Sequence, residues 1–583
     1  MKKKYLITTC LDYFKNKNKK STLLAGDWCL RDTKSDKIIF KNIFPSIWNN
    51  IKIQRKDIKI QKKIHGRLCG LISNYLFTYH NKKIPKKILS YYIHVWLVYY
   101  ISFYFYKWKT LNKIFSKNSN LIFRDYKTSH NPNFNNTKDF YNTAFKSNFF
   151  NYVAFKRIIN FKKKNNLTKI NIIKKNESLK NDYNEKKYQI SFKENIIMRF
   201  INFYQKIFNR KLLILDGLNY KLNILTNIKY FQIPIDFTIL FKWPDKLFKR
   251  KKNIRKIHIE TKTNDKFEKF LIQNLYNDIP SCFTFNFNLI DNQVNKIKLN
   301  PDKIITSAMY IHNDFVKLWL LKKKFINKKK LIFIEHGGGH HILGINWYNY
   351  QQLVGDIYIP WKNSSSDEIK NKIPNPKYLF NIKTRKKNSN KIIYVTSEIK
   401  DYVVHNRSGP MSIKENNIFS NFDTLSNNLK KDIVKNLYFL TKSELSTYFK
   451  DVLNNILSSK KVLKPGTLNS EIPKSKLIIC TYPQTSFIDS LLTGPTILLY
   501  NSKQWPPDND MKKFYNDLKK NKIAFEDPVS AAKHINSNWN NLNAWWNKEN
   551  VKKSRMNYLK KFNVAPNRNN SFFYYLNKLN SSL

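Results

Sequence analysis

The 583-residue chain is short of glycine, cysteine and acidic residues. It holds 12 glycines and five cysteines, and its 40 acidic residues are outnumbered by 106 basic ones. The cysteines lie far apart, with no CxxC pair, which argues against a disulfide scaffold or a zinc module and indicates free thiols in a reducing compartment. GxxxxGK[ST], GxSxG and GxGxxG are also missing, so a P-loop, a hydrolase elbow and a dinucleotide fingerprint lack support.

A formal net charge of +66 first suggests a nucleic-acid-binding protein without enzymatic activity. The lysines, however, are scattered beside Asn and Ile in nearly every segment, as in residues 160–166, and no basic face can be read from the sequence. We therefore keep nucleic-acid binding as a distant alternative. The charge should still attract anionic lipid headgroups or polyanionic substrates.

Residues 88–106 contain no Asp, Glu, Lys or Arg and are long enough to cross a membrane. They also contain six tyrosines, two serines and a histidine, whose polar groups would need partners in lipid. We expect a buried or peripheral helix here. The start of the chain has too short an apolar run for a secretory signal and is typical of a first β-strand.

The pattern of apolar segments predicts two α/β units joined by a Lys/Asn/Pro-rich linker over residues 362–390. Residues 45–115 are expected to be helical. Residues 116–190 shift to Asn, Lys and Ser, which predicts a mobile insertion or loosely packed loops. Two α/β units with a linker are the organisation of a bilobed enzyme with a ligand cleft between its lobes.

Five of the 12 glycines lie between Gly337 and Gly355. The apolar run 331–334 predicts a buried strand that delivers Glu335 and His336 to a loop of three glycines, Gly337, Gly338 and Gly339. Ligands bind at the carboxyl ends of such strands, and an imidazole placed there is a candidate general base. The alternative is a tight turn beside a structural histidine.

Two further histidines, His340 and His341, follow the glycines. A metal site would need them on one helical face with His336, and three glycines make a helix improbable, so we predict no metal.

A second candidate site follows the predicted strand 476–481. Thr485 or Ser486 can cap the next helix, where exposed N–H groups could hold a diphosphate or serve only as an ordinary cap. Arg407 follows the first strand of the second unit, so it could clamp a phosphate or lie on the surface.

Several pieces in order resemble a family of surface-polysaccharide (O-antigen, lipopolysaccharide) transferases with a GT-B-like architecture. They are residues 6–9, 24–29, the helix ending near Trp108, 335–339, 355–361, 482–496, 523–536 and 545–546. Glu335, His340 and His341 depart from that family's pattern, which usually has Gln before the histidine and an aromatic or small residue after the glycines.

The resemblance implies an α/β, GT-B-like fold with two Rossmann-like lobes, the first enlarged by helices. The acceptor lobe would cover residues 1–385 and the donor-nucleotide lobe 386–540, and C-terminal helices over 541–583 would pack back on the first lobe. It implies a metal-independent glycosyltransferase without a cofactor that moves a sugar from a nucleotide-sugar to a glycan or polyprenyl-linked glycan. The alternative on the same fold is a CDP-glycerol or CDP-ribitol phosphotransferase.

The predicted site residues fall into three groups. The catalytic pair is His336 and Glu335. The acceptor loop comprises Gly337, Gly338, Gly339, Asp356 and Trp361. The donor-binding residues are Arg407, Thr485, Ser486 and Asp489. We expect a cytoplasmic enzyme at the inner membrane face, docked by lysines and by partial insertion of helix 88–108, unless that helix is wholly core.

Overall fold

The computed structural model describes most of the chain. The described residues are 3–14, 21–31, 43–48, 50–128, 132–183, 191–207, 210–243, 259, 263–337, 350–362, 375–378, 385, 389–397, 399, 402–404, 412–457, 461–503 and 506–564.

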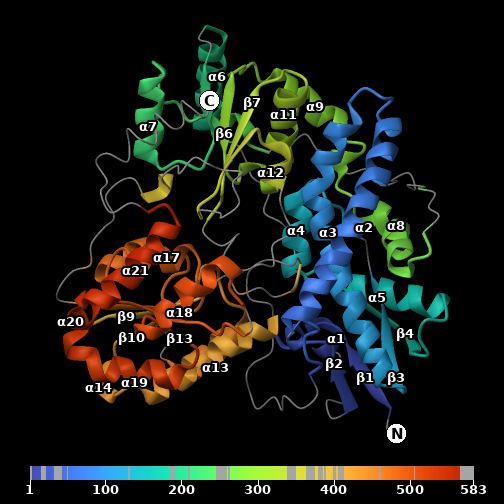
Figure 1. The fold of residues 1–583 in the computed structure, drawn as a ribbon. Coiled ribbons are helices and arrows are strands. Elements are labelled where there is room, and N and C mark those ends of the chain that lie inside the picture. Colours follow the sequence, from blue (N-terminus) through green and yellow to red (C-terminus); the bar gives the residue numbers. More distant parts are fainter. Residues whose placement is uncertain are drawn as a thin grey trace.

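Three separate parallel sheets organise the described chain (Figure 1). The first sheet has the order β2 (Thr22–Leu24), β1 (Lys4–Ile7), β3 (Leu121–Thr128), β4 (Asn171–Leu179). The middle sheet has the order β5 (Leu212–Ile214), β6 (Lys303–Thr306), β7 (Lys330–Ile334), β8 (Ile357–Ile359). The C-terminal sheet has the order β10 (Leu437–Leu440), β9 (Ile392–Val395), β11 (Leu477–Cys480), β12 (Thr496–Leu499), β13 (Ala524–Phe525).

The predicted α/β class with Rossmann-like parallel sheets is confirmed, but the N-terminal part contains two sheets where one was expected. The central strands of the middle and C-terminal sheets are almost continuously apolar, as in LIFI, IIYV and LIIC, and every residue of these three runs is buried. Such runs form because helices cover both faces of a parallel sheet.

The covering helices are mostly short. They are α1 (Cys10–Phe14), α4 (Thr137–Lys146), α5 (Asn148–Lys164), α6 (Phe192–Ile207), α7 (Tyr220–Lys229), α8 (Lys266–Asp278), α9 (Phe287–Lys296), α10 (Met309–His312), α11 (Asp314–Phe325), α12 (Tyr350–Val354), α13 (Ser412–Asn428), α14 (Lys431–Val434), α15 (Thr447–Ile456), α16 (Leu468–Glu471), α17 (Thr485–Leu491), α18 (Lys512–Lys520), α19 (Pro528–Asn538), α20 (Leu542–Asn547) and α21 (Glu549–Lys561).

Two long helices, α2 (Ile51–Tyr79) and α3 (Lys86–Lys117), run between the first and middle sheets (Figure 1). Helix α3 is long and apolar enough to cross a membrane, but 89% of its most apolar window is buried inside the protein. Tyr100 donates a hydrogen bond to the Leu271 carbonyl at 2.6 Å, and Tyr104 donates to Asp278 Oδ2 at 2.7 Å. Tyr100 and Tyr104 thus find partners in protein, and the expected buried helix is confirmed. Membrane insertion by residues 88–108 was wrong, because this segment is core.

The expectation of loose packing over residues 116–190 was also wrong. This segment supplies β3 and β4 of the first sheet together with α4 and α5, and α5 is buried along most of its length. Its aromatic residues pack inward between the polar ones. Lys162, whose ammonium lies 3.4 Å from the centre of the Trp108 ring, is itself buried. The lysine content therefore led to a prediction of loops for a segment that is folded, because the aliphatic stems of these lysines pack against aromatic rings.

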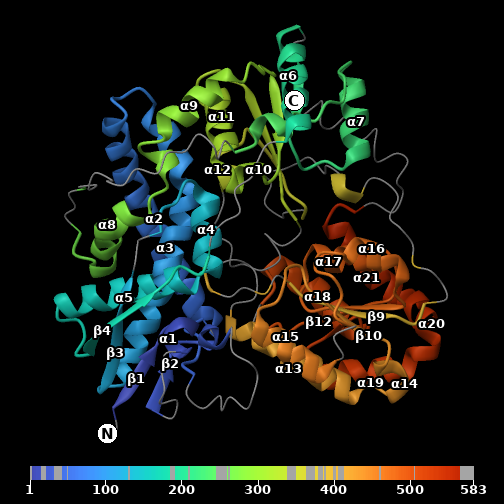
Figure 2. The same ribbon diagram turned by 180° about the vertical axis from the view of Figure 1, so that it is seen from behind.

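The described C-terminal helices pack on the C-terminal sheet (Figure 2), and the expected packing of residues 541–583 back on the first lobe stays a prediction. Tyr558 of α21 packs edge-on against Phe487 of α17, with ring centroids 5.4 Å apart, and Lys561 pairs with Asp510 at 3.2 Å. Both partners belong to the C-terminal part. Residues 565–583 lie outside the described residues.

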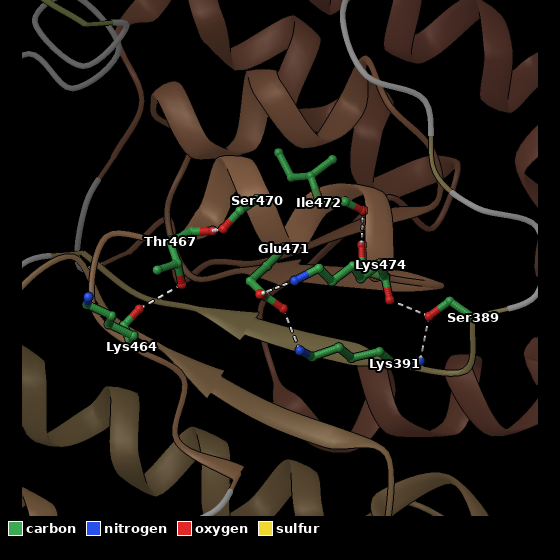
Figure 3. Close-up of polar contacts among 9 residues, drawn as sticks. Ser389, Lys391, Lys464, Thr467, Ser470, Glu471, Ile472 and Lys474 are labelled. Atoms are coloured by element: carbon green, nitrogen blue, oxygen red, sulfur yellow. Dashed lines mark hydrogen bonds and ion pairs between the residues drawn. The ribbon is translucent and has the colours of Figure 1, made fainter.

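The amino edge of the C-terminal sheet is closed by an ion-pair cluster centred on Glu471 (Figure 3). Its carboxylate binds Lys391, the residue before β9, and Lys474 at 3.1 Å. Burial alone would raise the pKa of Glu471, but the two lysines outweigh it and the pKa is lowered. This end of the sheet is therefore a satisfied structural edge.

Candidate functional site at the carboxyl edges of two sheets

The carboxyl edge of the middle sheet begins with a tight turn after β5. Asp216 accepts hydrogen bonds from the Thr306 hydroxyl at 2.6 Å and from the backbone N–H groups of Ser307, Ala308 and Met309 at 2.7–3.0 Å. Gly217 has φ +98°, and a Cβ there would lie 2.8 Å from the Ser307 Cβ. The turn therefore requires glycine, and it locks β5 to the end of β6.

Glu335 and His336, which follow β7, have different environments. Glu335 is only 2% exposed, and its Oε2 accepts the backbone N–H of Trp361 at 2.7 Å. Burial, and then the charge of Glu335, raise the pKa of Tyr358 well above its usual range. His336 is exposed. The strand thus presents the imidazole outward, while the carboxylate holds the segment after β8 in place.

Gly337 brings the two parts of the chain together. Its φ is +78°, in the left-handed region, and a Cβ on it would lie 3.1 Å from Thr485 Oγ1 on α17. The glycine loop after β7 and the loop after β11, both predicted as site segments, are therefore neighbours. The absent side chain at Gly337 is what allows this approach.

The strand order of the C-terminal sheet places a topological switch point between β9 and β11, since the chain continues from β9 to β10 on one side and to β11 on the other. Ligands of open α/β sheets bind beyond the carboxyl ends of the strands at such a point. The residues found there are Ser397, just after β9, and Thr481, just after β11. Thr481 donates its backbone N–H to the Val395 carbonyl at 3.1 Å, which joins the two strand ends.

Ser397 is 7% exposed, yet its hydroxyl has no hydrogen-bond partner among the residues that the structure describes. The buried hydroxyl oxygens of Ser443 and Ser446, which follow β10, and of Tyr500, which follows β12, are also unpaired. An unpaired buried polar atom costs about 1–3 kcal/mol. Unpaired buried atoms occur elsewhere in the described chain, but here they follow three strands of one sheet. This grouping is what a polar ligand would satisfy.

A polar cluster ties the middle sheet to the C-terminal sheet beside this edge. Lys377 and Tyr378 both reach Asp489 of α17 at 2.8 Å, and the Tyr378 ring packs edge-on against Trp361, with centroids 5.7 Å apart. Burial, and then the charge of Asp489, raise the pKa of Tyr378 well above its usual range. Trp361 is in turn held by Glu335. The chain of contacts from β7 to α17 is continuous.

Several predicted site residues have other tasks. Asp489 binds Lys377 and Tyr378, so it positions the linker segment, and its role in donor binding stays a prediction. Asp356 precedes β8, where its carboxylate accepts the Leu331 N–H at 2.7 Å and pairs with Lys324. It therefore lies at the amino edge of the middle sheet, opposite His336, and its place in the acceptor loop was wrong. The pattern failed because a short strand separates Asp356 from Trp361.

The cap of α17 also differs from the expectation. The N-cap is Gln484, without a side-chain capping bond, while Thr485 and the half-buried Ser486 are the first helical residues. Gly338, Gly339, His340, His341 and Arg407 lie outside the described residues. Within the described ranges, no group of three or more His, Cys, Asp or Glu side chains could hold a metal ion.

The sequence reading missed Ser397, Ser443, Ser446, Lys377 and Tyr378. The signal for Ser397 was present, since two hydroxyl residues, Thr396 and Ser397, follow the buried run 392–395 as Thr481 follows 477–480. The 375–378 segment gave no signal, because its polar partner is more than a hundred residues away in the sequence.

Comparison with known proteins gives one family. The profile of the LIC12162 family transferase matches residues 4–572. Among solved structures, the chain is similar to a protein described as a UDP-N-acetylglucosamine 2-epimerase from Listeria monocytogenes, with 12% identity, 47% of this chain and 77% of that chain covered, and a TM-score of 0.31. It is also similar to S. aureus MnaA, in a structure with UDP, with 13% identity, 63% and 97% covered, and a TM-score of 0.30. No curated protein sequence matches the chain.

Proposed function

The chain belongs to the LIC12162 transferase family, and from that membership we propose that it moves a sugar from a nucleotide-sugar donor to a surface polysaccharide, such as an O-antigen or lipopolysaccharide glycan. The observation that carries the proposal is the switch point of the C-terminal sheet. There the buried, unpaired Ser397 hydroxyl lies where open α/β sheets bind phosphate-containing ligands.

In the proposed reaction, the donor nucleotide binds the carboxyl edge of the C-terminal sheet at Ser397 and Thr481. The leaving diphosphate lies toward Thr485 and Ser486. His336 removes the proton from the acceptor hydroxyl as that oxygen attacks the anomeric carbon of the sugar, and the bond from that carbon to the diphosphate breaks. Glu335 acts as a positioning residue, because it touches Trp361 and is buried.

Gly337 gives the acceptor room, since the space that a side chain would fill lies beside Thr485. The proposed enzyme uses neither a metal nor a cofactor, so protein groups must stabilise the diphosphate. Arg407 and the glycines after Gly337 are candidate contributors. The acceptor is a glycan carried on a lipid at the inner face of the cytoplasmic membrane.

A thermal-shift panel tests the donor class. UDP-, GDP- or dTDP-sugars should raise the Tm of the full chain, by mass action of a ligand that binds only the folded state. A response to CDP-glycerol or CDP-ribitol alone would instead identify the alternative, a polyol-phosphate transferase. Its histidine-glycine loop would lie at the same sheet edge.

A matched pair of variants tests the place of binding. Ser397→Ala should weaken the nucleotide response about tenfold, the loss of one hydrogen bond to a charged group. Ser554→Ala removes another buried, unpaired hydroxyl, on α21 instead of a strand end, and should leave the response unchanged. Equal responses in both variants would move the donor away from Ser397.

A further inference from the structure

Large exposed hydrophobic side chains are concentrated in one short part of the described chain. Ten of the fifteen lie between residues 192 and 233, on α6, on α7 and in the loop after α7: Phe192, Ile196, Ile197, Phe200, Phe203, Tyr220, Leu225, Ile228, Phe231 and Ile233. The other five are spread over the rest of the described molecule. Monomeric soluble proteins rarely gather so much apolar surface without a partner for it.

Helix α6 is apolar on both sides. Ile201 is buried, while Phe192, Ile196, Phe200 and Phe203 recur at helical spacing on the opposite side and are 53–81% exposed. An ordinary surface helix would place polar residues there. The stripe of exposed side chains includes the cation of Arg199.

The loop after α7 carries the most exposed side chain in this group. Phe231 is 99% exposed and has φ +53°, which is uncommon for a bulky residue. Its neighbour Gln232 exchanges two hydrogen bonds of 3.1 Å with the backbone of Leu212, and Arg210 donates to the Ile233 carbonyl at 3.1 Å. The loop is therefore fastened to the start of β5 directly after Phe231, and the ring is held outward.

The charge around this surface is one-sided. Residues 192–233 contain seven basic side chains and two acidic ones. The acidic pair is already used, since Glu194 pairs with Lys242 and Asp216 binds the backbone after β6. A second copy of the same face would meet like charge, whereas an anionic surface would meet free cations such as Lys211 and Lys221.

We propose that α6, α7 and the Phe231 loop form a docking surface for an anionic lipid bilayer, with the aromatic side chains entering the headgroup region and the lysines binding lipid phosphates. Helix α3 cannot serve, because it is core. Figures 1 and 2 show α6 and α7 together beside the middle sheet. The docking surface thus belongs to the half that carries His336. The inference rests on the proposed function in one respect: an acceptor carried on a lipid gives the enzyme a reason to bind a bilayer.

The five native cysteines are all buried, so one introduced cysteine can be labelled selectively. The full chain carrying Phe231→Cys with an environment-sensitive fluorophore is mixed with vesicles of phosphatidylcholine alone or with phosphatidylglycerol. Val529→Cys, an exposed apolar position on α19, is the matched control. The 231 label should brighten several-fold with anionic vesicles at low salt, lose most of that response at high salt, and stay unchanged with neutral vesicles.

Unlabelled variants test the contributions separately by vesicle co-sedimentation. Phe200→Ser with Phe231→Ser should lower binding at least about tenfold. Lys221→Glu should lower it about fivefold or more, while Lys533→Glu on α19 should have little effect. Circular dichroism and Tm confirm that each variant is folded.

No brightening at 231 with anionic vesicles would overturn the proposal. A brightening that grows with protein concentration in the absence of vesicles would also overturn it, in favour of an interface between copies. Neither result touches the nucleotide response at Ser397, so failure of docking and failure of the proposed transfer are separable.

Discussion

The first and C-terminal sheets have the same kind of switch point but fill it differently. In the first sheet the point lies between β1 and β3, and it is closed by the chain itself. Both Asp12 oxygens accept the N–H and hydroxyl groups of Thr8 and Thr9 at 2.7–3.0 Å, and the Trp28 indole donates to the Thr8 carbonyl at 2.9 Å. In the C-terminal sheet, no described residue pairs with the corresponding Ser397 hydroxyl.

The comparison teaches that topology alone does not identify a binding site. A carboxylate occupies the donors of the first sheet where an anionic ligand would otherwise bind, and a Cβ at Gly26 would lie 2.2 Å from the Trp28 ring, so the edge is packed solid. At the C-terminal edge, the polar groups are left to bind a ligand. Chemistry should therefore depend on the C-terminal and middle edges, and stability on the first.

The largest expected effect is that of His336→Ala. Turnover should fall roughly 10²–10⁴-fold, the contribution of a general base, while Tm stays the same because the side chain is exposed. The rate is measured with the donor found in the nucleotide panel. Unchanged turnover would remove His336 from the mechanism and leave the open edge without its proposed base.

Asp12→Ala should have the opposite effect: it should lower stability and leave nucleotide binding intact. It leaves the four donors of Thr8 and Thr9 buried without an acceptor, so the free energy of unfolding should fall by about 3–5 kcal/mol. Urea titration measures the loss, and the nucleotide response at low temperature serves as the control that should persist. If the nucleotide response disappeared while stability did not change, the first sheet would be a ligand site after all.

Activity measured as a function of pH can be compared between the two edges only above about pH 6.5, because the protein loses stability below that pH. Burial lowers the pKa of His65 to about 4, although its hydrogen bond to the His94 carbonyl acts in the other direction. The unfolded chain takes up that proton near pH 6.5, so stability is complete above this pH and falls as the pH drops toward 4, by roughly 3 kcal/mol.

The variant His65→Gln should show a flatter fall of Tm over that range than the native chain. Parallel curves for the two proteins would assign the acid loss to other groups. Activity measured below pH 6.5 would otherwise mix unfolding with the titration of the site.

Gly337→Ala tests how closely the two edges approach. The left-handed φ costs about 1 kcal/mol for a non-glycine residue, and the added Cβ would press on Thr485 Oγ1. Combining it with Thr485→Ala should recover the steric part of the lost stability and not the backbone part. Strict additivity of the two substitutions would show that the residues are not in contact in solution.

The smallest effect is expected for Glu471→Gln at the amino edge of the C-terminal sheet. Its lysine partners are partly exposed, so the loss should stay below about 1 kcal/mol, with unchanged nucleotide binding. A strong effect on binding would mean that the two ends of the sheet are coupled.

The sequence predicted the elements whose pattern is local. The strand before Glu335, the strand ending at Cys480 and the buried helix over 88–106 were all found, because apolar runs and their breaks are short-range signals. What the sequence could not show depended on partners distant in the chain. Asp489 binds Lys377, and Glu335 accepts the Trp361 N–H. The helix α5 was missed because its aromatic residues are interspersed with lysines that composition alone counts as polar.

Every strand pairing in the described chain is parallel, and this has a consequence for how the protein is made. Tyr5 pairs with Ile122, so β1 must wait for more than a hundred further residues, on the order of ten seconds of synthesis, before its central neighbour exists. Helix α3 emerges in that interval, long before Leu271 and Asp278, which receive its tyrosines. Until those partners are synthesised, α3 is an apolar helix that is long enough to span a membrane. The rate at which other parts of the protein bury it decides whether α3 folds into the core or inserts as a membrane segment.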